Sequence, residues 1–181
     1  MITISAETVK DAAPREALLN RAFGLRRTRK TSERLREGRM PAEGLAFSVY
    51  GASGRLIGTV RLWNVIAGSA GPALLLGPIA VDCRHQRKGI GAALMNHAIT
   101  EARRLGHSAI LLVGDAAYYN RFGFDTDLMR HLHLPGPVDR GRFLGLELEP
   151  NALDGAEGLV MASGRAIPER VEVATSLAAA G

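Results

Sequence analysis

A run of glycine and cationic residues lies where a strand is expected to end and a helix to begin. The residues are Gln86-Arg87-Lys88-Gly89-Ile90-Gly91-Ala92. Helices usually begin with a Ser, Thr, Asp or Asn cap. Glycine and positive charge in that position indicate a site for an anion instead. Glycine lets the backbone approach a ligand closely, and the first amides of a helix have no partner inside the helix.

The spacing of these glycines excludes two common nucleotide-binding loops. A P-loop requires Gly-x4-Gly-Lys-Ser/Thr, and the chain contains no such string. A dinucleotide-binding loop requires a third glycine three residues after Gly91, where this chain has Leu94. Two interpretations of the spacing remain. The turn is either a cradle for a pyrophosphate or a plain glycine-rich connection.

The residues around these glycines resemble a known family. Gln86–Gly91 fits the pattern Gln/Arg-x-x-Gly-x-Gly/Ala, the acetyl-CoA motif of the GNAT superfamily of N-acetyltransferases. Further along the chain, AYYNRFGF (residues 117–124) is similar to the aromatic-Tyr-x-Lys/Arg-x-Gly-Phe signature of that family's next helix and strand. The resemblance is clearest over residues 45–124, extends to the helical N-terminal part, and says little about the residues after 150.

The resemblance implies an α+β fold with three layers, α/β/α. Its central sheet is mixed and mostly antiparallel, and helices cover both faces. In this fold the fourth and fifth strands splay apart, and the pantetheine arm of acetyl-CoA lies between them. Gly77-Pro78 interrupts the apolar strand expected over residues 73–83. That interruption fits a splay on physical grounds, because proline lacks the N–H that a sheet ladder needs.

The resemblance also assigns residues to acetyl-CoA, the acyl donor and cosubstrate. The backbones of Ile79, Ala80 and Val81 would bind the pantetheine amides, as a peptide adds to a sheet edge. Gln86 takes the first position of the motif. The pyrophosphate would lie on the backbone amides of Arg87, Lys88, Gly89, Ile90, Gly91 and Ala92.

Tyr119 matches the tyrosine that acts as an acid in the family, and it would also contact the bound acetyl-CoA. The implied reaction is direct attack of a primary amine on the thioester in a ternary complex. The departing thiolate then takes a proton from the phenol. Holding the two reactants in register would supply much of the acceleration. Tyr118 fills the aromatic position before it, where packing is the main expectation.

The general base is left open by the sequence. Many members of the family carry a carboxylate on the fourth strand, whereas this chain has Leu74-Leu75-Leu76-Gly77 there. His131 and His133 are candidates, because imidazole titrates near neutrality. Asp115 is expected to cap the tyrosine helix and not to catalyse.

Two further positions have a structural and a functional interpretation. Trp63-Asn64, at the end of a hairpin, would line the acceptor pocket, or Trp63 would fill the core. Cys83 is the single cysteine, which excludes an internal disulfide and a cysteine-cluster metal site. We expect Cys83 to be a small residue at a strand end, not a nucleophile, and we expect no metal.

The hydrophobic pattern predicts the elements that position these residues. A strand–helix–strand crossover around the glycine motif predicts a parallel strand pair within a mostly antiparallel sheet. The helix over 90–105 is expected to bury Ile90, Leu94, Ala98, Ala102 and Leu105. The other expected elements are a strand over 2–7, helices over 9–23 and 31–40 (the latter capped by Thr31 or Ser32), a hairpin of 45–51 with 55–65, a strand over 108–114, a short helix that runs into a turn and a further strand over 115–124, a loop over 130–141 and a last strand over 143–150.

Length and composition indicate one globular domain. The chain has 181 residues, of which 46% are hydrophobic and 23% charged, and this balance excludes a disordered chain. We expect residues 1–150 to form the acyltransferase domain and residues 151–181 an extension packed on it. No apolar run is long enough for a bilayer, and the N-terminus is not a signal peptide. The expectation is therefore a cytoplasmic, bacterial protein without a membrane partner.

The charge of the chain allows an anionic partner but does not favour nucleic acid. The net charge is +5, and the cations are spread along the chain without interleaved aromatic residues or zinc spacing. Positive charge also disfavours a polycationic acceptor. A polyamine, an aminoglycoside, an amino acid and a protein amine all stay open as acceptors, and so does a homodimer.

Three classes of function follow. The first is an acyltransferase, of the kind that moves groups other than aminoacyl groups, acting from acetyl-CoA to the primary amine of an unidentified acceptor. The second is a non-catalytic acyl-CoA-binding sensor or scaffold of the same fold. The third and weakest is a basic nucleic-acid binder, whose affinity would fall steeply with salt.

Overall fold

Alternating and continuous apolar segments form a mixed sheet at the centre of the molecule. The computed structural model describes residues 3–168. The strands run in the order β1-β2-β3-β4-β5-β7, and β8 pairs with β3 and β6. The β4–β5 and β6–β8 pairs are parallel, and the other pairs are antiparallel. The strands are β1 (Ile4–Ala6), β2 (Ala46–Tyr50), β3 (Leu56–Ala67), β4 (Pro72–Val81), β5 (Ala109–Val113), β6 (His131–His133), β7 (Phe143–Glu147) and β8 (Glu157–Ala162).

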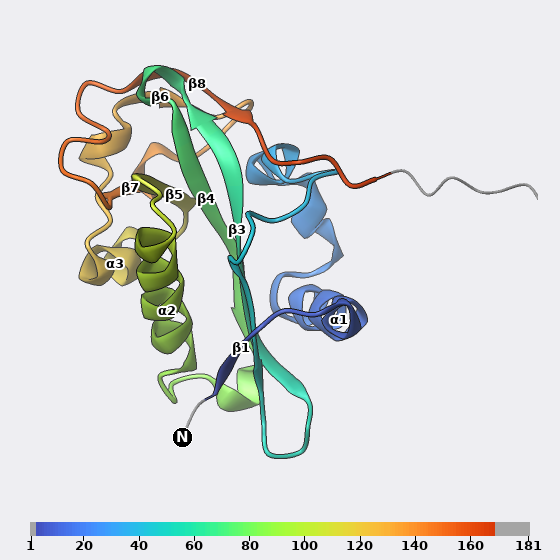
Figure 1. Cartoon of the computed structure of the whole chain (residues 1–181). Helices are drawn as coiled ribbons and strands as arrows, with labels where there is room; N and C mark the ends of the chain where they lie inside the picture. The colour runs from blue at the N-terminus through green and yellow to red at the C-terminus, as the bar shows by residue number, and fades with distance from the viewer. Residues whose placement is uncertain (1–2, 169–181) are drawn as a thin grey trace, which may run out of the picture.

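Helices cover both faces of this sheet, which gives the three layers that the sequence predicts. Helix α2 (Ile90–Arg104) lies on one face, and α1 (Ala12–Phe23) lies on the other (Figure 1). The short helix α3 (Ala116–Tyr119) follows β5. In the described part of the chain no helix is both long and apolar enough to cross a membrane. The 3-10 turns are η1 (Val9–Asp11), η2 (Leu25–Arg29), η3 (Thr31–Leu35), η4 (Gly68–Ala70), η5 (Cys83–His85), η6 (Asn120–Phe122), η7 (Asp127–Met129) and η8 (Arg140–Arg142).

The core lies in layers on the two sides of the sheet. Successive residues of a strand point to opposite faces, so Leu74 and Leu76 of β4 pack in the cluster under α2, whereas Leu75 packs in the opposite cluster with Trp63. Helix α2 buries Ile90, Leu94, Ala98 and Ala102 as expected. The prediction for Leu105 was wrong. It is 41% exposed, because the helix ends at Arg104 and Leu105 follows as its C-cap.

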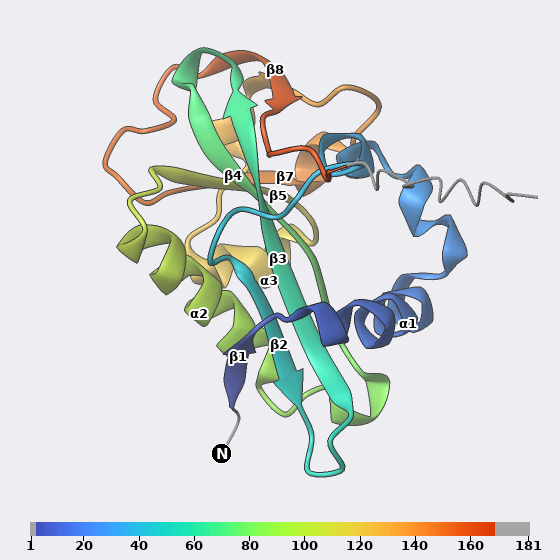
Figure 2. The same cartoon turned by 45° about the vertical axis from the view of Figure 1, so that its right-hand side comes forward.

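The helix predicted over residues 31–40 is a shorter 3-10 turn, η3, and it follows the 3-10 turn η2. Its N-cap is Lys30 and makes no side-chain cap hydrogen bond, so the predicted Thr31 or Ser32 cap was wrong. Gly38 has φ +68°, in the left-handed region where glycine commonly ends helical structure. Figure 2 shows this segment and α1 on the same side of the sheet.

Two strands lie where the sequence predicted none, whereas the prediction of a further strand after the short tyrosine helix was wrong, because only an isolated bridge of Asp125 with Gly145 forms there. The loop expected over 130–141 contains β6, and β7 is not the last strand, because β8 forms within residues 151–168. Strand β8 pairs with β3 over Val65–Ala67, and β6 pairs with β8. The part of the predicted 151–181 extension beyond residue 168 lies outside the described residues.

Strands β4 and β5 separate after two paired positions. Their register is Leu74 with Ile110 and Leu75 with Leu111. Beyond Leu75, Gly77 has φ +122°, and the register between β4 and β3 shifts between Val60 and Leu62, so β4 is irregular at Gly77-Pro78, where its pairing with β5 has ended. Trp63 Nε1–H donates to the Gly77 carbonyl at 2.6 Å from a buried position. This hydrogen bond holds the bend of β4 from the sheet face opposite α2. Beyond the bend, a space lies between β4 and β5.

Candidate active site

Two cavities meet at the splayed strands. The loop cavity, of ≈ 500 Å³, lies between the end of β4, the Gln86–Ala92 turn and the tyrosine helix. The splay cavity, of ≈ 790 Å³, lies between β4, β5, the η2–η3 segment and the loop over residues 134–142. Ile79, Tyr118 and Tyr119 line both cavities. The two cavities are therefore adjacent, and these three residues lie between them.

The residues that the sequence assigned to acetyl-CoA converge on the loop cavity. Lys88 is exposed and does not line it. The predicted residues that do line it are Ile79, Ala80, Val81, Gln86, Arg87, Gly89, Ile90, Gly91, Ala92 and Tyr119.

The turn before α2 has the geometry of an anion cradle. Gly89 is the N-cap of the helix and lies at φ +79°, in the left-handed region that glycine occupies without steric cost. The Ala93 N–H donates to the Gly89 carbonyl at 2.9 Å, which is the first bond of the helix. The preceding amides, including those of Ile90 and Gly91, have no partner within the helix. A Cβ at position 91 would lie 3.1 Å from Tyr118 Oη, so glycine keeps this entrance open.

The free edge of β4 presents backbone groups at alternate residues. Asp82 N–H donates to the Ile57 carbonyl of β3 at 2.8 Å. Backbone groups alternate between the two edges of a strand, so those of Ala80 face β3, and those of Ile79 and Val81 face the splay. Gln86 Nε2 donates to the Val81 carbonyl at 3.4 Å from that side. The sequence assigned the backbones of Ile79, Ala80 and Val81 to the pantetheine amides. The geometry fits this assignment for Ile79 and Val81. Ala80 lines the cavity, but its backbone groups face β3.

Tyr119 lies at the junction of the cavities, on the short helix after β5. A Cβ on Gly114 would lie 2.2 Å from Tyr119 Cε2, so the ring packs directly on the backbone at the end of β5. Burial raises the pKa of Tyr119 to about 12, and the nearby Arg142 opposes this shift. The phenol therefore keeps its proton at neutral pH.

Tyr118 is packed by its neighbours. Its ring meets the Tyr119 ring edge-to-face, with centroids 4.9 Å apart, and the Arg121 guanidinium lies 4.2 Å from its centroid. These contacts agree with the packing role expected for Tyr118. They also hold its ring in place between the two cavities, both of which it lines.

The other sequence candidates are mostly structural. His131 and His133 are exposed on β6 and line neither cavity, so the structure does not place them to act as a base. Asp115 caps α3 as predicted, since its Oδ1 accepts from Ala117 N–H at 3.2 Å. Trp63 belongs to the core and lines neither cavity.

Asn64 and Cys83 also lie outside both cavities. The Asn64 carbonyl accepts from Ser163 N–H at 3.1 Å, and Cys83 is exposed directly after the end of β4. Among the described residues no group of three His, Cys, Asp or Glu side chains could hold a metal ion.

Sequence reasoning missed the wall of the splay cavity that the η2–η3 segment provides. Thr31 Oγ1 and Arg34 Nη1 donate to the carbonyls of Pro137 and Pro135, so this segment is tied to the 134–142 loop across the cavity. No motif marks these residues. The one available signal was the basic run LRRTRKTSERLR (residues 25–36).

Comparison with known proteins identifies the family. The Acetyltransferase (GNAT) family model matches residues 15–124. An uncharacterized N-acetyltransferase, YhbS of Escherichia coli strain K12, is 30% identical over 158 residues, which cover 87% of this chain and 93% of that protein.

Two solved structures extend this similarity to the fold. The crystal structure of E. coli YhbS in complex with CoA has a TM-score of 0.75 at 28% identity, and the match covers 90% of this chain and 89% of that one. A GNAT family acetyltransferase from Brucella melitensis in complex with acetyl-CoA has a TM-score of 0.65 at 25% identity, covering 90% and 96%. This chain, with its glycine turn and tyrosine helix beside the two cavities, therefore belongs to the GNAT family of acetyltransferases.

Proposed function

We propose that this protein transfers an acetyl group from acetyl-CoA to the primary amine of an acceptor, by direct attack within a ternary complex. One observation carries the proposal. The loop cavity, built from the acetyl-CoA motif, adjoins the splay cavity, and the two share Ile79, Tyr118 and Tyr119 as lining residues. The two reactants can thus meet beside a phenol that holds its proton. A cytoplasmic location and a homodimer belong to the same proposal and rest on the sequence alone.

The residues of the loop cavity fit the donor. The unpaired amides after Gly89, together with the Arg87 and Arg121 side chains, suit a pyrophosphate. The outward backbone groups of Ile79 and Val81 suit the amides of a pantetheine arm, which would take the place of a neighbouring strand. A donor held in this way presents its thioester between β4 and β5, at the Tyr119 side chain.

Tyr119 supplies the acid in this scheme. The amine nitrogen forms a bond to the thioester carbon, the carbon–sulfur bond breaks, and the phenol gives its proton to the departing thiolate. The nitrogen loses a proton to solvent as the amide forms, and the phenolate regains a proton from solvent, so the cycle balances. Burial raises the pKa of Tyr119 to about 12, which makes the phenol a weaker acid than in water. The same desolvation acts on a thiolate in this site and raises its basicity, so the two groups stay matched.

The carboxylates on the splay cavity are engaged elsewhere. Glu33 pairs with Arg36 at 3.3 Å, Asp115 caps α3, and Asp139 Oδ1 accepts from Gly141 N–H at 2.9 Å. We therefore expect the acceptor to react as the free amine that is present in solution. Its turnover should rise with pH as the ammonium group loses its proton.

Release of free thiol from acetyl-CoA with a panel of primary amines tests the proposal. Thiol release that depends on the amine, with an acetylated amine found by mass spectrometry, is the expected result. Tight binding of acetyl-CoA with no turnover across the panel would contradict it and favour the sensor or scaffold. Binding of DNA or RNA that weakens steeply with salt would favour the nucleic-acid binder.

A further inference from the structure

The splay cavity carries far more positive than negative charge. Within the described residues, six cationic side chains and three carboxylates line it. The cations are Arg27, Arg29, Lys30, Arg34, Arg36 and Arg142. Five of the six lie within residues 27–36, on η2, on η3 or directly beside them, far along the chain from the turn that would hold the pyrophosphate. This charge is therefore separate from the charge that serves the donor.

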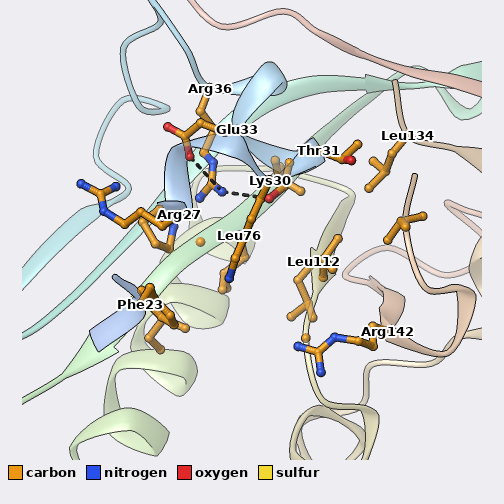
Figure 3. Close-up of a pocket in the computed structure, with 18 of the residues that line it drawn as sticks. Phe23, Arg27, Lys30, Thr31, Glu33, Arg36, Leu76, Leu112, Leu134 and Arg142 are labelled. Atoms are coloured by element: carbon orange, nitrogen blue, oxygen red, sulfur yellow. Dashed lines mark hydrogen bonds and ion pairs between the residues drawn. The ribbon is translucent and has the colours of Figure 1, made fainter. Parts of the chain in front are cut away.

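Some of these cations are already paired, and others are not. Arg27 pairs with Glu16, outside the cavity, and Arg36 pairs with Glu33. In the described part of the chain Lys30 and Arg142 take part in no ion pair. Figure 3 shows both side chains reaching into the cavity from opposite sides. A ligand between them would meet two unneutralised positive charges.

Arg36 adds a buried donor to the same wall. Its side chain is 9% exposed, and its Nε is buried without a hydrogen-bond partner among the described residues. Its Nη2 donates to Ser32 Oγ at 3.0 Å, and its Nη1 lies 3.7 Å from the position of a Cβ on Gly77, at the bend of β4. Burying a charged guanidinium with an unpaired N–H group costs folding free energy, unless another group in the cavity accepts a hydrogen bond from that N–H.

We propose that the splay cavity selects an acceptor that carries an anionic group, a carboxylate or a phosphate, in addition to its primary amine. Lys30 and Arg142 bind that group, and buried Arg36 supports the positive field. The inference rests on the proposed function, because it names the class of acceptor for the same site. It favours amino acids and phosphorylated amines over polyamines and aminoglycosides.

The same cations act on the reacting amine. A positive field in a partly desolvated cavity disfavours the ammonium form and favours the neutral amine. The positive field thereby helps the acceptor ammonium to lose its proton, although β4 carries no carboxylate that could act as a base. A polycation would meet the same field as repulsion along its whole length, so it cannot use this assistance.

Matched pairs of acceptors test the inference. O-Phosphoethanolamine is compared with ethanolamine, and 4-aminobutyrate with butylamine, by the kcat/KM for thiol release. We expect the anionic member of at least one pair to be preferred by about tenfold or more, as for one charge-assisted contact. The phosphate and carboxylate arms show which anion is used. Equal or better use of the neutral amines would overturn the inference and leave the proposed function standing.

Charge-removing variants locate the preference. Lys30→Gln and Arg142→Gln should each lower the anionic-to-neutral ratio of kcat/KM at least about threefold, the effect of weakening one ion pair. Arg26→Gln, an exposed cation of η2 that lines neither cavity, should leave the ratio unchanged. Because both acceptors of a pair react beside the same Tyr119, an effect of Arg142 on the phenol cancels in the ratio. A ratio that is the same in all three variants would overturn the inference.

Binding without turnover separates this inference from the proposed function. Calorimetry measures O-phosphoethanolamine and 4-aminobutyrate binding to the protein saturated with CoA, so that the pyrophosphate cradle is filled. Binding that weakens in Lys30→Gln and Arg142→Gln supports the anion site, and if acetyl-CoA then releases no thiol with any amine of the panel, the same result contradicts the proposed function. Failure of both probes to bind and to be acetylated contradicts the anion site.

Discussion

At the residue scale, the proposed reaction depends on one phenol, that of Tyr119. The family signature predicts Tyr119, and the structure places it where the two cavities meet. Its neighbour Tyr118 has the same side chain but is held by aromatic and cationic contacts. Both tyrosines line both cavities, and we propose that Tyr119, not Tyr118, meets the reacting atoms.

Replacing Tyr119 by phenylalanine should lower kcat by at least about tenfold, the range expected for loss of a general acid. The ring remains, so the packing against Gly114 and the affinity for acetyl-CoA should be retained. Steady-state kinetics with the best amine of the panel measure the change. Tyr50→Phe is the matched control, because Tyr50 lines neither cavity and should keep full turnover. An unchanged kcat in Tyr119→Phe would remove this residue from the acid role.

The pH profile gives the same variant a second readout. An acid acts while it is protonated, and burial raises the pKa of Tyr119 to about 12. The wild-type kcat/KM should therefore rise with pH as the amine is deprotonated and show no decline from Tyr119 below about pH 11. A decline near pH 10 that disappears in Tyr119→Phe would mean that the phenol ionises at its ordinary value.

At the element scale, the turn before α2 must hold its amides in one arrangement. Gly89 makes this possible because its φ of +79° is unfavourable for any residue with a Cβ. Local sequence is sufficient to predict this turn, since the motif, the strand before it and the amphipathic helix after it are contiguous. The η2–η3 segment is different, because 3-10 turns leave no apolar periodicity to recognise.

Gly89→Ala should raise the KM for acetyl-CoA by at least about fivefold. An alanine at this left-handed φ is strained by about 1 kcal/mol, and the turn relieves the strain by moving the amides that would bind the pyrophosphate. Gly54→Ala is a close control. Gly54 has φ +72° and, like Gly89, has nothing within 4 Å of an added Cβ, but it lies in the β2–β3 hairpin. Both variants should lose similar thermal stability, and only Gly89→Ala should change the KM. An equal KM in the two variants would exclude the cradle.

At the scale of the whole molecule, residues 157–162 join the sheet that carries the candidate site. Strand β8 pairs with β3, and it buries Val160 completely while Leu159 beside it is 48% exposed. Leu153 and Ala156, which precede β8, are also buried in the cluster that contains Trp63. We propose on this basis that the extension and the acyltransferase domain unfold together.

Val160→Ala should lower the free energy of unfolding by about 2 kcal/mol, because it removes buried methyl groups and leaves a cavity. Leu159→Ala, on the exposed face of the same strand, should cost less than about 0.5 kcal/mol. Denaturant unfolding measured by both fluorescence and circular dichroism gives the values and tests for a single transition. Two separated transitions, or no difference between the variants, would contradict a shared core.

By itself, the sequence determined the parts of this protein that are encoded within short stretches. These are the hairpin, the acetyl-CoA turn with its helix, the bend at Gly77-Pro78 and the tyrosine signature, and from them the family and the order of the layers. Each has a local cause in periodicity, in the φ preference of glycine or in the missing N–H of proline.

Only the tertiary structure decided what lines the cavity proposed for the acceptor. Lys30 and Arg142 are more than a hundred residues apart in the chain, and they line the same cavity because the η2–η3 segment and the 134–142 loop close over the splayed strands. The pairing of β6 with β8 and the exclusion of His131 and His133 from the site have the same origin. Such contacts depend on packing between distant segments, and a three-residue strand or an isolated cation carries no local pattern that specifies its partner.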